Sequence, residues 1–192
     1  MASAALAKWQ KQRATSLNEM EGAHRHIGGS GRGRRFATQQ VNRAYAVLLS
    51  SEFQGFCRDL YIESSIVLAD CITPQALQPV VKAEFRLHLK LERGNPNPGN
   101  IGSDFNRLGL DLWKILKSRY VHNNTRQKYL EELNVWRNAI AHNDFTDPKL
   151  NGNTEIYLSW VRGWRRACDQ LASEMDIVLS DHLRQFSGMA PW

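Results

Sequence analysis

Three side chains within six residues of this chain are suited to chemistry on a phosphodiester: Arg137, Asn138 and His142. An arginine keeps its charge at any cellular pH, and its planar head can grip two phosphate oxygens at once. A histidine gives and takes a proton near neutrality without a large environmental shift. Because RNA carries its own nucleophile in the ribose 2'-hydroxyl, these three groups need no activated serine or cysteine beside them.

The spacing of these residues places them on neighbouring parts of one helix. Asn138 and His142 stand four positions apart, so they share a helix face, one turn apart. Arg137 is about 140° round the axis from His142, at roughly 100° per residue, and must reach round. A structural interpretation stays open, because a histidine at a helix C-terminus is favoured by the helix dipole and Asn143 is a common helix cap.

This block resembles the motif of the HEPN superfamily (higher eukaryote and prokaryote nucleotide-binding domains). That motif is an arginine, a spacer of four to six residues that begins with a polar one, and a histidine. Here the spacer is Asn138-Ala139-Ile140-Ala141. The segment 52–60, with the sequence EFQGFCRDL, is similar to the long early helix of the RiboL-PSP and MAE-type HEPN branch. The resemblance covers most of residues 36–186.

The resemblance implies a homodimeric helical bundle with metal-independent endoribonuclease activity, often the toxin of a toxin–antitoxin or other defence system. The expected partners are RNA, a second copy of the chain and an antitoxin or defence-system protein, and no cofactor is expected. Some HEPN toxins carry a tyrosine two residues after the histidine, where this chain has Asp144. Regulation by modification of that tyrosine is therefore not supported.

The expected reaction is attack of the ribose 2'-hydroxyl on the adjacent phosphorus, which leaves a cyclic phosphate and a 5'-hydroxyl. His142 would act as general base or acid, Arg137 would hold the non-bridging oxygens, and Asn138 would orient the phosphate or His142. The alternative is a non-catalytic HEPN-like module that binds RNA or a partner protein. On the early helix, Glu52, Arg58 and Asp59 either support the catalytic site or form surface ion pairs.

Positive charge is concentrated at the N-terminus. Of the net charge of +6, residues 1–35 hold +5, from seven Lys/Arg against two Glu. Arg32, Arg34 and Arg35 are candidate RNA contacts, although basic tails also serve solubility or partner docking. The glycines around them lack the Gly-Lys-Ser/Thr ending of a phosphate-binding loop and indicate a linker. We therefore expect a basic N-terminal helix and Gly/Arg-rich linker over 1–35 and a HEPN-like helical domain over 36–192.

A second cluster of aromatic and basic residues begins the last expected helix. Its aromatic rings could receive bases and its guanidinium groups could receive phosphates. The competing interpretation buries the tryptophans and exposes the arginines. The cluster consists of Trp160, Arg162, Trp164, Arg165 and Arg166, of which the three arginines are candidate RNA contacts.

Apolar residues recur at helical spacing along the chain, and alternation typical of strands is scarce. We expect an all-α, up-and-down bundle of about five to six helices that forms a homodimer. Thr125 is expected to cap the motif helix, and a loop is expected over 94–100. The other expected helices cover 4–21, 36–70, 75–91, 103–120 and 160–186, with a short extended piece at 155–158.

The cysteines, the histidines and the length of the apolar runs indicate a cytoplasmic protein without a metal site. The three cysteines, Cys57, Cys71 and Cys168, lack paired spacing and indicate reduced core thiols. No histidine has the neighbours of a metal site. Charged residues interrupt the first twenty positions, and no run approaches the eighteen or so apolar residues of a membrane span. We expect neither a secretory signal nor a membrane partner.

Overall fold

The computed structural model describes residues 1–28 and 36–192, and all regular elements in these ranges are helical. The all-α prediction is thus confirmed. No helix there combines the length and apolar character needed to cross a membrane. The elements are α1 (Ala4–Lys8), a π-helical turn (Trp9–Arg13), α2 (Ala14–Gly28), α3 (Phe36–Asp70), a 3₁₀ turn (Gln75–Leu77), α4 (Gln78–Arg86), α5 (Lys90–Arg93), α6 (Pro98–Asn106), α7 (Leu112–Arg119), α8 (Asn123–His142), a 3₁₀ turn (Pro148–Leu150) and α9 (Leu158–Ser187).

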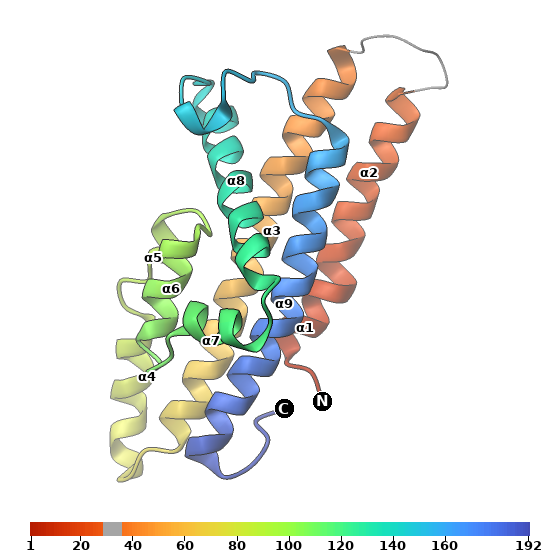
Figure 1. Cartoon of the computed structure of the whole chain (residues 1–192). Helices are drawn as coiled ribbons and strands as arrows, with labels where there is room; N and C mark the ends of the chain where they lie inside the picture. The colour runs from red at the N-terminus through yellow and green to blue at the C-terminus, as the bar shows by residue number, and fades with distance from the viewer. Residues whose placement is uncertain (29–35) are drawn as a thin grey trace.

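The two longest helices, α3 and α9, run side by side along the molecule (Figure 1). Helix α8 packs against both of them, and the N-terminal helix, α1 to α2, packs mainly against α3. The shorter helices from α4 to α7 contact α3, α8 and α9. Helix α3 is therefore covered on several sides, and four of its large side chains, Tyr45, Phe53, Phe56 and Leu60, are fully buried.

The predicted helices at 36–70 and 160–186 match α3 and α9 closely, but the segment between them differs from the prediction. The helix expected over 75–91 ends at Arg86, because Leu87 is extended and His88 has a positive φ of 58°. The helix expected from 103 begins at Pro98, because the side chain of Asn97 caps it by accepting a hydrogen bond from the N–H group of Asn100. It also breaks before residue 112, since Gly109 has a φ of 73°. The described ranges contain no strand at 155–158.

The N-terminal helix shares the core of α3. Trp9 is buried, and its ring meets the ring of Phe53 edge-on with 5.7 Å between centroids. Its indole N–H donates a hydrogen bond of 3.1 Å to Asp169 on α9. One side chain therefore joins the N-terminal helix to both long helices.

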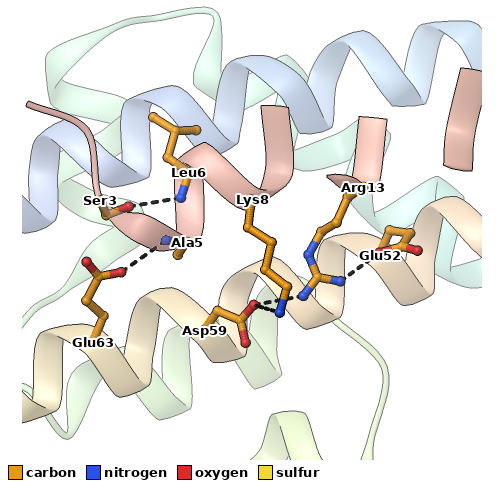
Figure 2. A network of polar contacts seen from close by, with 8 residues as sticks. All are labelled: Ser3, Ala5, Leu6, Lys8, Arg13, Glu52, Asp59 and Glu63. Atoms are coloured by element: carbon orange, nitrogen blue, oxygen red, sulfur yellow. Dashed lines mark hydrogen bonds and ion pairs between the residues drawn. The ribbon is translucent and has the colours of Figure 1, made fainter. Parts of the chain in front are cut away.

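Polar contacts fix the first turn of this helix (Figure 2). The Ser3 hydroxyl accepts a hydrogen bond of 3.0 Å from the N–H group of Leu6. The Glu63 carboxylate of α3 accepts hydrogen bonds from the N–H groups of Ala4 and Ala5, each of 3.0 Å. These bonds satisfy donors that a helix start leaves unpaired.

Further along, Arg13 is held between two carboxylates of α3 (Figure 2). Its guanidinium lies 2.6 Å from Glu52 and 2.8 Å from Asp59, and Lys8 also binds Asp59 at 2.9 Å. Burial alone would raise the pKa of Asp59, but Lys8 and Arg13 lower it overall. Gly55 makes the approach of Arg13 feasible, because a Cβ atom there would overlap the Arg13 guanidinium.

The cysteines occupy different environments. Cys57 and Cys168 are buried, and burial raises the pKa of both thiols. Cys71 is exposed, because it follows the last residue of α3, so the prediction of a core thiol is wrong at this position.

The division of the chain at residue 35 stays a prediction, and the contacts of Trp9 provide a test of it. We expect Trp9→Ala to lower the free energy of unfolding by about 3–5 kcal/mol, as removal of a large buried ring does. Urea denaturation followed by circular dichroism measures this change. Lys11→Ala, at an exposed position of the same turn, is the control and should change it by less than about 0.5 kcal/mol. Equal, small effects would contradict a core role for this helix.

Candidate functional site

The predicted catalytic residues lie on the last two turns of α8. The buried face of this helix, which includes Leu133 and Trp136, packs against α3 and α9. Asn138 and His142 are exposed, and Arg137 is half-buried. The helix begins at Asn123 rather than after Thr125, so the predicted cap is wrong while the placement of the motif late in the helix is confirmed.

The side chain of Asn138 accepts two hydrogen bonds, one from Arg137 and one from a residue of a distant loop. The side-chain oxygen of Asn138 accepts a bond of 3.2 Å from Arg137 and one of 2.9 Å from the amide of Asn95. Within the described part of the chain, no carboxylate pairs with Arg137, and the amide N–H groups of Asn138 have no acceptor. These free donors and the unpaired cation are the groups that an anion such as a phosphate needs.

Asn95 was not predicted from the sequence, and the loop that carries it is held firmly. Gln54 of α3 donates to the carbonyl groups of Leu91 and Gly94, at 2.5 and 2.8 Å. The buried amide of Asn134 donates to the carbonyl of Pro96 at 3.1 Å. The composition of 94–100 predicts a loop, but nothing in it connects the loop to a motif some forty residues later.

His142 is the final residue of α8. Asn143 adopts the left-handed conformation, with a φ of 49°, and the N–H group of Asp144 bonds to the carbonyl of Ala139 at 2.9 Å. This pattern ends a helix abruptly. No hydrogen bond joins His142 to Arg137 or Asn138 within the described residues. The structure therefore brings Arg137 and Asn138 together and leaves His142 separate at the helix end.

The chain after His142 is anchored to α3. The guanidinium of Arg43 lies 4.8 Å from the ring centroid of Phe145 and donates a hydrogen bond of 3.0 Å to the carbonyl of Thr154. Phe145 also meets Trp136 of α8, with 6.3 Å between ring centroids. The position of the helix end therefore depends on α3 as well as on the cap.

Asp144 places a negative charge close to His142. The hydroxyl and the N–H group of Thr146 donate to its carboxylate at 2.7 and 3.0 Å. These two bonds lower the pKa of Asp144, and a positive charge on His142 acts in the same direction. Asp144 is therefore an anion beside the imidazole at neutral pH.

Two of the predicted RNA contacts are engaged within the protein. Arg162 donates to the Glu21 carboxylate of α2 at 2.9 and 2.6 Å. Arg165 donates to the hydroxyl of Tyr45 at 3.0 Å and to the side chain of Asn18 at 2.7 Å. Burial opposes ionisation of Glu21, but the hydrogen bond and charge of Arg162 lower its pKa overall. These arginines join α9 to α2 and α3.

Trp164 and Arg166 of the same cluster differ in burial. Trp164 is buried and donates to Glu132 at 3.2 Å, as the structural interpretation of the cluster expects. Arg166 is exposed and has no polar partner among the described residues. The remaining candidates, Arg32, Arg34 and Arg35, lie outside the described residues.

Two of the three polar residues of the early helix form ion pairs. Glu52 and Asp59 bind Arg13 of the N-terminal helix, as described above. Arg58 is exposed and has no polar partner in the part of the chain that the structure describes. Ion pairing within the protein thus accounts for the two carboxylates.

No group of three or more metal-ligating side chains gathers in the described ranges. The chain matches no protein-family model, no curated protein and no solved structure. The likeness of the motif to the HEPN superfamily therefore stays a prediction.

The cap after His142 gives a stability prediction. Asn143→Ala should lower the free energy of unfolding by roughly 1–2 kcal/mol, because a Cβ-bearing residue without a polar side chain is disfavoured in the left-handed conformation. Asn143→Gly should leave it unchanged or raise it, since glycine accepts this conformation freely. Thermal denaturation of the two variants measures the difference. Equal stabilities would contradict the left-handed cap.

Proposed function

We propose that this protein is a metal-independent endoribonuclease of HEPN type. The observation that carries the proposal is the pair formed by Arg137 and Asn138. The guanidinium of Arg137 donates to the side chain of Asn138 and has no carboxylate partner in the described residues. His142 follows Asn138 one turn later on the exposed side of the same helix. A phosphodiester would supply the negative charge that this pair lacks.

In the proposed reaction, the 2'-hydroxyl of RNA loses a proton and attacks the adjacent phosphorus, and the 5'-oxygen of the next nucleotide leaves with a proton. His142 carries one of these protons as general base or acid. Arg137 holds the non-bridging oxygens as negative charge builds on them. Asn138, held by Asn95, keeps the guanidinium in place and offers its own N–H groups to the phosphate.

We also propose that the active form is a homodimer in which two motif helices meet about a twofold axis. Within one chain His142 makes no bond to Arg137 or Asn138, and the three groups form a sparse site. An isologous contact would bring two copies of each of these groups to one composite site shared by the two chains. The role as a toxin or defence effector, the antitoxin partner and the cytoplasmic location are further proposals that rest on the motif resemblance.

A second candidate function is a non-catalytic module that binds RNA or a partner protein. The separation of His142 from the Arg137–Asn138 pair favours it, because binding needs the cation and the amide but no proton transfer. The two candidates differ in one result, which is whether bound RNA is cut.

Cleavage of RNA in the presence of EDTA is the direct test. We expect His142→Ala to slow cleavage by about 10²- to 10⁴-fold, the usual contribution of general acid–base catalysis, with unchanged circular dichroism. Labelled total RNA resolved on a denaturing gel gives the rates. His122→Ala, at an exposed position beside the other end of α8, is the matched control and should cleave normally. Retained cleavage by pure His142→Ala would refute the catalytic role of this histidine.

Arg137→Lys separates geometry from charge. We expect severe loss of cleavage, because a point charge cannot reproduce the two-pronged contact of a guanidinium. Normal activity of the lysine variant would mean that Arg137 contributes only its positive charge.

Mixing two inactive variants tests the composite site. Purified Arg137→Ala and His142→Ala chains should each be inactive, and their mixture should regain cleavage if one site takes its arginine and its histidine from different chains. Sedimentation of the wild-type chain as a monomer that still cleaves RNA would contradict the dimer.

A further inference from the structure

A groove follows the exposed side of α8 and starts at Asn138, one residue of the proposed catalytic pair. Three adjacent hollows make up this groove, and Lys149 lines all of them. Val135 lines both the hollow beside Asn138 and the middle hollow. Trp136 lines both the middle hollow and the hollow beside α9. The groove therefore connects Asn138 with the start of α9, where Arg166 lies.

The end beside α9 is the largest hollow of the groove, at about 460 Å³, and it is lined by aromatic rings. Tyr129 is 41% exposed there, and Trp160 is half-buried. The ring of Trp160 is held by Trp136 at 5.9 Å and by Tyr157 at 5.0 Å between centroids. These contacts fix the orientation of Trp160, and accessible aromatic rings are platforms on which an unpaired base stacks.

Polar groups surround these rings. The exposed side chains of Asn151 and Asn153 line the same hollow. The amide of Asn153 donates one hydrogen bond to the carbonyl of Leu150, so its oxygen and the amide of Asn151 are the groups that can meet the edge of a base. Arg166 supplies a cation there that has no polar partner in the described residues. Aromatic rings, amides and a free guanidinium together form the set that single-stranded nucleic acid requires.

Lys149 and Glu131 form the middle of the groove. They make an ion pair of 2.7 Å, and both side chains are more than half exposed, at 62% and 51%. Such exposed pairs add little to stability, so a phosphate can take the place of the carboxylate on Lys149. The other acidic side chain of the groove, Glu132, accepts a hydrogen bond from the neutral indole N–H group of Trp164 and keeps its charge. The cations that line the groove, Lys128, Lys149 and Arg166, outnumber these two carboxylates.

We propose that this groove binds the stretch of single-stranded RNA next to the cleaved phosphodiester. A base stacks on Tyr129 and Trp160, Arg166 and Lys149 contact phosphates, and the backbone then reaches Arg137 and Asn138. This assignment of a substrate-binding surface rests on the proposed ribonuclease function. The rings require an unstacked base, so the groove selects single strands over duplexes.

Binding of RNA that cannot be cut tests the groove separately from catalysis. The probe is a short fluorescein-labelled RNA of mixed sequence with 2'-O-methyl groups, which lacks the nucleophile, and fluorescence anisotropy with the full chain at fixed salt gives its affinity. Tyr129→Ala and Arg166→Gln should each weaken binding by about tenfold. An unlabelled duplex of the same length should compete poorly.

Matched controls lie outside the groove. Tyr120→Ala removes a tyrosine of nearly the same exposure, 43%, and Arg184→Gln removes another exposed arginine of α9. Both controls should bind the probe like the wild-type chain. All four substitutions are at exposed positions, so we expect the fold to persist, and circular dichroism checks this.

The outcomes separate the two proposals. Wild-type affinity in both groove variants, or equal competition by duplex, overturns the groove even if the chain cleaves RNA. Weakened binding in both variants supports the groove even if wild-type protein fails to cleave natural RNA, which would overturn only the proposed activity. No affinity of the wild-type chain for the probe overturns the groove and leaves a protein partner as its occupant.

Discussion

The structure depends on the burial of α3 on several sides at once. Its rings meet Trp9 of the N-terminal helix, and its length packs against α8 and α9. Because a helix so covered cannot shift without opening the core, the elements attached to it hold fixed positions. Two of these matter for the candidate site. Gln54 holds the loop of Asn95, and Arg43 holds the segment that follows His142.

The candidate site thus combines a rigid support with exposed chemistry. Asn138 receives hydrogen bonds from Arg137 and Asn95, so one amide orients the cation and ties it to the loop that α3 holds. Such pre-organisation is what electrostatic catalysis requires, since donors that are already in place need not reorganise as charge develops. His142 differs, because its position is set by the helix end rather than by a hydrogen bond to the pair. That difference is the physical reason for proposing a second chain at the site.

Sequence patterns predicted the long helices and the placement of the motif, and they missed contacts between distant segments. Helical periodicity is strong in α3 and α9, and both were predicted within a few residues. The helices from 78 to 119 were predicted poorly, because caps and positive φ angles at Asn97, His88 and Gly109 decide their ends. The contact of Asn95 with Asn138, and the engagement of Arg162 and Arg165 by α2, arise from tertiary packing that no local pattern contains.

The ends of the RNA fragments show whether the ribose 2'-hydroxyl is the nucleophile. If the 2'-hydroxyl is the nucleophile and the motif supplies only positioning and proton transfer, fragments made by the wild-type chain in EDTA carry a cyclic phosphate and a 5'-hydroxyl. Mass spectrometry of a short defined substrate distinguishes these ends. Fragments with a 3'-hydroxyl and a 5'-phosphate would contradict this role of the 2'-hydroxyl, because they form when water attacks the phosphorus and the 3'-oxygen leaves.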